Sequence, residues 1–444
     1  MYGPRELTHP RDEIVRTMER IYRYRMTTTS GGNLSILDDD GSVWITPARV
    51  DKGGLRRDDV VRVRPDGSVE GPHRPSSEFP FHRAIYDSRP DLKAIVHAHP
   101  VALVAFSICR RVPDTRLLPQ SRRVCGAVGF APYALPGSEA LGRSIAAAFA
   151  EGSHCLVLEN HGVVTGGATL AHAFERFETL EFAAKTVIKA STLGPVRYLA
   201  DALVDCPRPA AGGPPEPRTG PVTSREKELR AQLCEFVRRS YRQRLMISTV
   251  GAFSARLDPD SFLITPHRTD RHDLDPADIV LVSRGRPEEG KTPSSAGRNH
   301  QAVYDAHSEV HAVVNAYPVN ATAFAVTGAP LETRTIPESY IFLRDVPRIP
   351  YAYRFVDGGE IAAHTSLKSP VLILENDGVQ VLGTTVLDAF DRLEVLESTA
   401  EAMINGLALN AGVIHRMPDD VIAELERAFG LDELPTAPPD HDTK

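Results

Sequence analysis

Residues 94–100 read Ala-Ile-Val-His-Ala-His-Pro, and they anchor the interpretation of the first half of the chain. Their composition predicts a strand that extends to His99. Alternate side chains of a strand share a face, so His97 and His99 could bind one divalent metal. A second apolar run, Cys155–Asn160, predicts a buried strand that ends directly at His161. Three neutral imidazoles with one open position are typical of a catalytic zinc site.

The composition is that of an ordinary globular protein. The 444 residues suffice for two or three domains, and 42% hydrophobic residues, 25% charged residues and a net charge of -7 give no sign of nucleic-acid binding. Five cysteines without a Cys-x-x-Cys pair argue against a disulfide framework and against a cysteine zinc site. We see no secretory signal and no apolar run of about 18 residues, so we expect a cytoplasmic protein without membrane association.

The second half of the chain repeats the first, block by block. Thr46 and Thr265 lie in matching Ile-Thr-Pro segments 219 residues apart, and Asn160 and Asn376 lie in matching Leu-Glu-Asn segments 216 residues apart. Several matching blocks in the same order indicate a tandem duplication. A Pro- and Gly-rich stretch between the halves predicts a semi-rigid linker. The predicted first domain, linker, second domain and flexible tail are residues 1–203, 204–223, 224–432 and 433–444.

The duplication allows an internal comparison at the candidate site. A lone His-x-His motif is more often two ordinary histidines, so the comparison matters more than the motif. The second half replaces Glu78, His97, His99 and His161 by Ala296, Asn315, Tyr317 and Asp377, and Asn33 by Ala252. The framework around these positions is retained. Such correlated replacement is expected if the residues form one site that only the first half has kept.

Seven short motifs of the first half form a specific set. They are Gly-Asn-Leu-Ser at 32–35, Ile-Thr-Pro at 45–47, Leu-Arg-Arg-Asp-Asp-Val-Val at 55–61, Pro-Ser-Ser-Glu at 75–78, His-Ala-His-Pro at 97–100, Ala-Pro-Tyr-Ala-Leu-Pro-Gly-Ser at 131–138 and Asn-His-Gly at 160–162. With these motifs, residues 8–200 resemble the class II aldolase/adducin family. The resemblance implies two tandem α/β domains of three α/β/α layers, each with a mostly antiparallel central sheet flanked by helices. The second would be a degenerate, pseudo-catalytic copy.

The same resemblance implies a zinc-dependent lyase. A zinc ion, or another divalent metal, would be held by His97, His99 and His161, and Glu78 would act as the acid–base group. Such a site suits the cleavage or formation of a C–C bond in a small hydroxy-carbonyl compound, because the metal can stabilise the negative charge of an enediolate or enolate. Alternatively, Glu78 is an ordinary acid at a helix N-terminus, where negative charge is mildly favourable.

The resemblance also implies where a substrate binds. In family aldolases that act on sugar phosphates, the phosphate contacts correspond here to Gly32, Asn33, Ser76 and Ser77. A further phosphate-binding loop departs from the family pattern, because it reads Thr-Pro-Ala-Arg and lacks a hydroxyl and a glycine. Its Arg49 could bind a phosphate or a carboxylate, or it could block the pocket. This departure argues against a standard sugar phosphate as the substrate.

Several alternative functions stay open. Decarboxylation of a 3-oxo acid and dehydration of a ketose phosphate use the same enediolate chemistry. Epimerisation is less favoured, because the family's epimerases carry Asp where this chain has Glu78. A non-catalytic, adducin-like interaction protein would need no metal at all. In the second half, Ser294, Ser295 and Arg298 could bind an anionic effector, or they could simply cap a helix.

The family's assembly implies a partner. Family members place their sites between neighbouring subunits of a four-domain ring, so two chains of this protein are expected to form a homodimer with a pseudo-tetrameric ring. The second domain would then border the site of the first and could lend a hydroxyl from Tyr340, Tyr351 or Tyr353. The same tyrosines could instead be buried, hydrogen-bonded interface residues.

Overall fold

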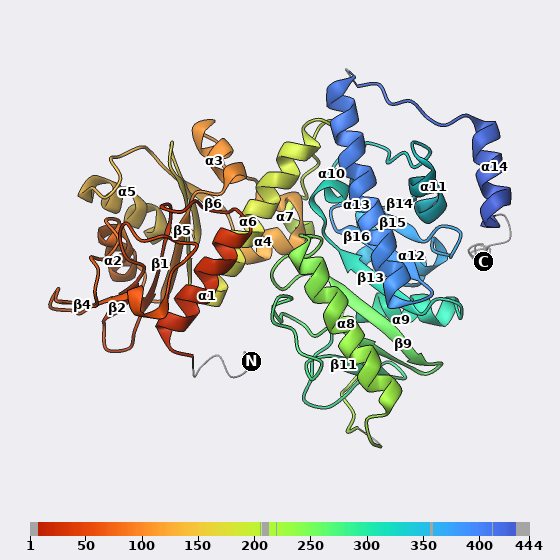
Figure 1. Cartoon of the computed structure of the whole chain (residues 1–444), viewed down its shortest axis with the longest axis horizontal. Coiled ribbons are helices and arrows are strands. Elements are labelled where there is room, and N and C mark those ends of the chain that lie inside the picture. Colours follow the sequence, from red (N-terminus) through yellow and green to blue (C-terminus); the bar gives the residue numbers. More distant parts are fainter. Residues whose placement is uncertain are drawn as a thin grey trace. The chain divides into compact units, whose positions relative to one another are not determined.

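The computed structural model describes residues 8–204, 206, 213–218, 220–355, 358–410 and 412–431. The chain divides into two compact units, residues 1–185 and 186–444 (Figure 1). Each unit contains an eight-stranded, mostly antiparallel sheet with flanking helices, which confirms the predicted pair of α/β domains. The predicted flexible tail at 433–444 lies outside the described residues.

The first unit, called the first domain below, alternates strands and helices. Its strands are β1 Asn33–Leu37, β2 Val43–Ile45, β3 Val61–Val63, β4 Val69–Glu70, β5 Ala94–Ala98, β6 Val128–Ala131, β7 Cys155–Leu158 and β8 Gly162–Gly167. Its helices are α1 Pro10–Arg23, α2 Phe79–Ser88, α3 Val101–Ile108, α4 Pro119–Cys125, α5 Glu139–Ala150 and α6 Leu170–Ala190, with 3-10 turns η2 Arg57–Asp59 and η3 Thr115–Leu117. Helix α6 crosses the division between the two units.

The second unit, called the second domain below, repeats this order. Its strands are β9 Ala252–Asp258, β10 Ser261–Ile264, β11 Val280–Ser283, β12 Arg286–Pro287, β13 Ala312–Ala316, β14 Arg348–Ile349, β15 Val371–Leu374 and β16 Gly378–Gly383. Its helices are α7 Asp201–Val204, α8 Ser224–Arg242, α9 Gly297–Ala306, α10 Val319–Ala325, α11 Pro337–Leu343, α12 Gly359–Ala363, α13 Val386–Leu409 and α14 Asp419–Phe429, with a 3-10 segment η4 Tyr351–Phe355.

The two sheets have the same strand order. It is β4-β3-β2-β1-β5-β8-β7-β6 in the first domain and β12-β11-β10-β9-β13-β16-β15-β14 in the second. Every neighbouring pair is antiparallel except β6 with β7 and β14 with β15. The strand that carries the His-x-His motif, β5, and its counterpart β13 therefore lie at the centre of their sheets, where they are buried on both faces.

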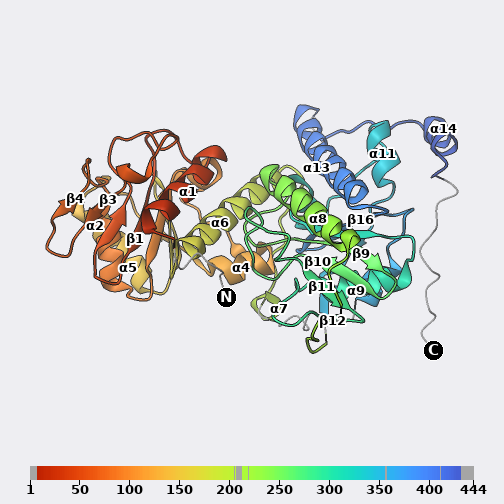
Figure 2. The ribbon, with the colours of Figure 1, turned by 60° about the horizontal axis from the view of Figure 1, so that its bottom comes forward.

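Helices cover both faces of each sheet. In the first domain, α2 and α5 pack on the face that bears Ile95, and α1 packs on β1 and β2. The buried residues Ile14, Met18 and Ile21 of α1 recur at helical spacing, which is why this helix buries one side. In the second domain, α9 and α12 cover one face, and α8 and α13 lie side by side on the other (Figures 1 and 2).

Two details differ from the sequence prediction. Strand β5 ends at Ala98 rather than at His99, because Pro100 has no N–H for the ladder and starts the turn into α3. The division between the domains also comes before residue 203. Arg197 N–H donates to the carbonyl of Val326 at 2.8 Å, so this segment belongs with the second domain.

The described part of the predicted linker is not a free spacer. Glu216 forms a β-bridge with Glu288, and the N–H of Gly213 donates to the carbonyl of Gly285 at 2.9 Å. Arg218 pairs with both Glu226 and Glu288. These contacts attach residues 213–218 to the edge of the second sheet.

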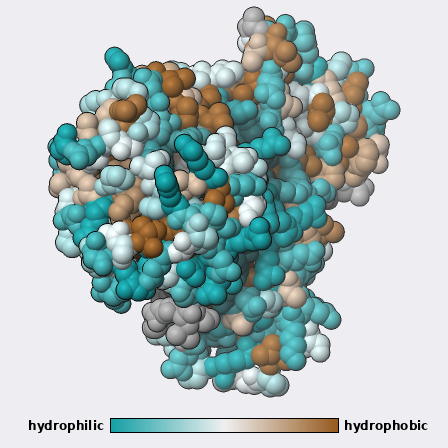
Figure 3. All heavy atoms as spheres, turned by 60° about the vertical axis from the view of Figure 1, so that its left-hand side comes forward, coloured by the Kyte–Doolittle hydropathy of each residue, from teal (hydrophilic) through white to brown (hydrophobic). Residues whose placement is uncertain are grey.

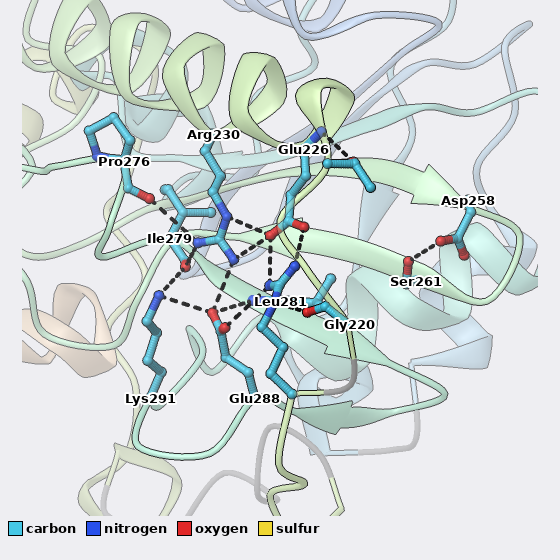
Figure 4. Close-up of polar contacts among 12 residues, drawn as sticks. Gly220, Glu226, Arg230, Asp258, Ser261, Pro276, Ile279, Leu281, Glu288 and Lys291 are labelled. Carbon is cyan, nitrogen blue, oxygen red and sulfur yellow. Dashed lines mark hydrogen bonds and ion pairs between the residues drawn. The ribbon is translucent and has the colours of Figure 1, made fainter.

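A buried ion-pair network reinforces this attachment. Arg230 of α8 donates to Glu226 at 2.8 Å and to Glu288 at 3.2 Å, and Lys291 lies 3.0 Å from the same Glu288 (Figure 4). The side chains of Glu226 and Arg230 are 2% and 8% exposed. Each buried charge thus has partners of opposite sign, as burial requires.

The molecular surface mixes polar and apolar residues. On the face shown in Figure 3, hydrophobic residues lie in separate small groups among hydrophilic ones, an ordinary distribution for a protein surface. No described helix combines the length and the apolar character needed to cross a bilayer.

Candidate metal centre

The three predicted histidines lie together in the first domain. One ligand atom from each of His97, His99 and His161 lies within 4.8 Å of the others, and the Nε2 atoms of His97 and His99 are 3.1 Å apart. Two imidazole nitrogens on a tetrahedral zinc are separated by about 3.3 Å, given Zn–N distances of about 2.0–2.1 Å. The cluster therefore has the dimensions of a metal site.

The sheet positions each ring differently. The Nδ1 of His97 lies 3.0 Å from the carbonyl of Val163 on β8 and donates to it, which leaves Nε2 free as a ligand. His161 lies in the tight turn between β7 and β8, where Asn160 has φ of 52°. His99 follows β5 and packs closely on Gly162, where an added Cβ would lie 2.6 Å from the His99 ring.

Glu78 faces the same ligand atoms. Its Oε2 lies 3.1 Å from His97 Nε2, and its Oε1 lies 3.3 Å from His161 Nε2. Asn33 Nδ2 donates to Oε2 at 2.7 Å. Burial alone would raise the pKa of Glu78, but the adjacent imidazoles of His97 and His161 and the Asn33 hydrogen bond outweigh it and hold this pKa well below its usual range. The carboxylate is therefore charged at neutral pH.

The donor set fits a divalent cation. Burial, followed by repulsion from His97, lowers the pKa of His99 to about 3 and that of His161 to about 4, so both rings are neutral ligands at pH 7. Among the described residues, Glu78 Oε1 and His161 Nδ1 are buried without a hydrogen-bond partner. Such orphaned atoms are costly, and water on a bound ion would give the Glu78 oxygen a partner. Three imidazoles suit zinc, and also iron, cobalt or manganese.

A buried hydrogen-bonded chain runs from Glu78 into the core. Asn33, which donates to Glu78, has its Oδ1 against His82 Nε2. His82 Nδ1 lies 2.6 Å from Ser35 Oγ, which lies 2.6 Å from the hydroxyl of Tyr86. Burial first, and then repulsion from His97, lowers the pKa of His82 to about 3, so it is a neutral link in this chain. The sequence prediction missed this role of His82, although its spacing in α2 identifies it as inward-facing.

The other predicted site residues have distinct positions. Gly32 has φ of 75°, and an added Cβ would lie 2.7 Å from the carbonyl of His97, so only glycine fits there. Ser76 is buried and its Oγ accepts from the N–H of Glu78 at 3.3 Å, so it supports the start of α2. Ser77 and Arg49 are exposed. The structure thus brings Gly32 and Asn33 to the histidines and leaves Ser77 and Arg49 at the surface.

Arg49 also has a counterpart in the second domain. It has φ of 57° in the turn after β2, and Arg268 has φ of 51° in the matching turn after β10. The arginine is therefore kept in the domain that has lost the histidines. This retention does not link Arg49 to the metal centre.

The second domain has no equivalent cluster among its described residues. The hydroxyl of Tyr317, at the position of His99, donates to Asp377, at the position of His161, at 3.1 Å. Asn315, at the position of His97, receives a hydrogen bond at 2.6 Å from His300 Nε2. The side chains that replaced the ligands thus bond to each other or to the core.

The predicted second-domain residues have partners of their own. Burial, together with the hydrogen bond that the Tyr340 hydroxyl donates to Glu426, raises the pKa of Tyr340 to about 12. The hydroxyl of Tyr351 donates to the carbonyl of Leu203, and the ring of Tyr353 stacks on His364. These contacts favour a structural role for the tyrosines. Ser294 Oγ accepts from the N–H of Ala296 at 3.4 Å, which favours helix capping at that position. The binding of an anionic effector by Ser295 and Arg298 stays a prediction.

Sequence reasoning also missed Ser107. This buried residue of α3 donates from its Oγ to the carbonyl of Leu158 at 2.5 Å and accepts from the N–H of His161 at 3.1 Å. A signal was present in the repeat, because Ala-Phe-Ser at 105–107 matches Ala-Phe-Ala at 323–325. The serine is lost together with the histidines.

Comparisons with known proteins identify the family of both halves of the chain. The family model of the Class II Aldolase and Adducin N-terminal domain matches residues 12–188 and 231–404. The chain is 32% identical over 195 residues to a 3-oxo-tetronate 4-phosphate decarboxylase of Escherichia coli (strain K12), covering 43% of this chain and 90% of the relative. It is 30% identical over 174 residues to an L-fuculose phosphate aldolase of Methanococcus vannielii, covering 39% of this chain and 92% of the relative.

Solved structures give similar matches. An L-fuculose 1-phosphate aldolase is 30% identical, with a TM-score of 0.41, and the match covers 44% of this chain and 92% of that protein. The two matched segments of the family model together span most of the chain and coincide with the two sheets. The protein is therefore a member of the Class II Aldolase and Adducin N-terminal domain family that carries the domain twice.

Proposed function

We propose that the first domain is a metal-dependent lyase of the aldolase type that acts on a small hydroxy-carbonyl compound. One observation carries this proposal: the Glu78 carboxylate lies 3.1 Å and 3.3 Å from two nitrogens of the histidine cluster, inside a buried site. Such a carboxylate can act as an acid–base group, and a cation bound at the adjacent histidines could stabilise developing negative charge. The second domain lacks the same residues together.

His97, His99 and His161 would hold the metal. When bound, a zinc or other divalent ion would act as a Lewis acid that stabilises negative charge on a carbonyl oxygen of the substrate. His99 and His161 need no deprotonation to bind it, because burial keeps both rings neutral. The hydrogen bond from His97 Nδ1 to Val163 orients that ring before any ligand arrives.

Glu78 would carry the proton. In a retro-aldol cleavage Glu78 takes the proton of the substrate hydroxyl, and the C–C bond breaks. The electron pair of that bond stays with the fragment that carries the original carbonyl group. The protonated Glu78 can then deliver the proton to that fragment. Asn33 holds one carboxylate oxygen at 2.7 Å, which fixes the orientation of Glu78. The low pKa of Glu78 means that its carboxylate carries no proton at neutral pH and is free to accept one.

Decarboxylation is the second candidate. It is favoured by the 32% identity to a 3-oxo-tetronate 4-phosphate decarboxylase over 90% of that relative. In this reaction the broken C–C bond leads to a carboxylate, so carbon dioxide leaves and the bonding electron pair stays on the remaining fragment. Glu78, a carboxylate at neutral pH, accepts a proton from water and passes it to that fragment. The two reactions share the residues and differ in the leaving group.

The first test is metal content. We expect about one metal per chain in the wild type and little in His97→Ala, measured by elemental analysis after dialysis. Asn315→Ala is the matched control at the same place in the second domain, and it should keep the metal. Absence of metal from the wild type, even after incubation with zinc, would contradict the proposal and favour an adducin-like scaffold.

The second test separates the two reactions. Metal-loaded protein is incubated with aldol substrates and, separately, with 3-oxo acids, and the products are assayed as released aldehyde and as carbon dioxide. Aldehyde release that depends on Glu78 supports the aldolase, and carbon dioxide release supports the decarboxylase.

The homodimer with a four-domain ring also stays a proposal. Light scattering of the purified protein would test it by measuring the mass of the assembly.

A further inference from the structure

The turn that bears His161 is attached to α3 by one side chain. Ser107 Oγ donates to the carbonyl of Leu158 at 2.5 Å and accepts from the N–H of His161 at 3.1 Å. It therefore bridges the two ends of the turn between β7 and β8. Ser107 is fully buried, so no water competes for these hydrogen bonds.

The corresponding turn in the second domain lacks this bridge. Ala325 replaces Ser107, and there the N–H of Asn376 donates to the carbonyl of Ala325 at 3.1 Å. The turn itself keeps its form: Asp377 N–H donates to the carbonyl of Leu374 at 3.0 Å, as His161 N–H does to Leu158 at 3.2 Å. A serine is therefore not needed to form the turn.

His161 depends on this turn more than His97 does. The ring of His97 is oriented through its own Nδ1, which donates to Val163. Among the described residues, the Nδ1 of His161 has no hydrogen-bond partner. Metal-binding histidines are usually oriented through the second ring nitrogen, so His161 must be oriented through its backbone instead.

We propose that Ser107 is a positioning residue that holds the backbone of His161 and thereby raises the affinity of the metal centre. This inference rests on the metal site of the proposed function. The hydroxyl bonds to the backbone of the turn and not to the imidazole of His161. It was lost in the domain that lost the ligands, and it was kept where a ligand has to be held.

The test compares metal affinity in matched variants. Zinc affinity of the full-length protein is measured by competition with a chromophoric chelator, and the absorption bands of the cobalt-loaded protein report ligand geometry. Loss of a residue that orients a metal ligand typically weakens binding by about 10–100-fold. We expect a loss in this range for Ser107→Ala, with altered cobalt bands, and recovery in Ser107→Thr. Ala325→Ser, the matched control, should leave both readouts unchanged.

Three results would overturn the inference. Zinc affinity of Ser107→Ala within about twofold of the wild type, with unchanged cobalt bands, would show that the hydroxyl does not position His161. If Ser107→Ala and Ser107→Gly both fail to fold in metal-free thermal melts, the hydroxyl serves folding instead. A wild type that binds neither zinc nor cobalt would overturn this inference together with the proposed function, which separates the two kinds of failure.

Discussion

The two domains share a sheet order, yet they differ in what lies at its centre. β5 and β13 occupy the same central place, but β5 carries His97 where β13 carries Asn315. Framework positions such as Gly32 and Gly251 keep their positive φ in both domains. The comparison teaches that the fold needs the backbone turns and the apolar faces, whereas the metal centre depends on a few side chains that can be lost without loss of the fold.

A buried histidine shows how the second domain adapted. His82 and His300 occupy the same place in α2 and α9, and each contacts a core serine whose hydroxyl also hydrogen-bonds to a tyrosine. His82 meets Asn33 on β1, whereas His300 meets Asn315 on β13, the strand paired with β9.

The asparagine has thus changed strand while its contact with the histidine is retained. A buried ring nitrogen needs a partner in either domain, because an unsatisfied polar group is costly. The histidine, serine and tyrosine are kept in the domain without the histidine cluster, so this part of the chain is structural.

The largest expected effect is the loss of catalytic rate when Glu78, which only the first domain carries, is replaced. Glu78→Gln removes the acid–base group but keeps the shape of the side chain, so we expect kcat to fall by about 10²–10⁴-fold while metal content is retained. Steady-state kinetics and elemental analysis check the two parts. Full activity in Glu78→Gln would exclude Glu78 as the proton carrier, and Ala296→Glu should add no activity in the second domain.

The next largest expected effect is the dependence of the second domain's free energy of unfolding on pH. Burial lowers the pKa of His300 from an ordinary value of 6.5 to about 4. The unfolded chain therefore takes up a proton that the folded domain resists, and the free energy of unfolding should fall by up to about 3 kcal/mol as the pH drops from about 6.5 to about 4.

Hydrogen exchange of second-domain peptides measures this loss. His300→Gln should flatten the dependence, because Gln does not titrate. An unchanged slope in His300→Gln would assign the acid sensitivity to other groups. His82, whose pKa is lowered to about 3, should extend the same loss to lower pH in the first domain.

The smallest effect concerns the asparagine that changed strand. Asn33→Ala leaves the buried Nε2 of His82 without its partner, and Asn315→Ala does the same to His300, so each should cost about 1–3 kcal/mol in its own domain. Trp44, the single tryptophan, reports urea unfolding of the first domain by fluorescence. Asn33→Ala should move the Trp44 transition and Asn315→Ala should not, and equal shifts would mean that the domains unfold together.

The duplication, the candidate site residues and the buried strands can be predicted from the amino-acid sequence. The matched blocks reveal the duplication, and the joint loss of Glu78, His97, His99 and His161 marks one site, because residues of one site are lost together. Burial patterns likewise place β5 and β7 in the interior, since their runs are apolar on both faces. These features depend on local composition and on repeated order along the chain.

The remaining features depend on contacts between residues far apart in the chain. Ser107 lies 54 residues from His161 and Asn33 lies 49 residues from His82, and no motif pairs them. The end of β5 at Ala98 and the attachment of Glu216 to Glu288 depend on backbone hydrogen bonds. Composition and spacing indicate which residues are candidate ligands. The partner of a buried polar atom is instead set by the register of neighbouring strands and by helix packing, because only folding brings those atoms within hydrogen-bonding distance.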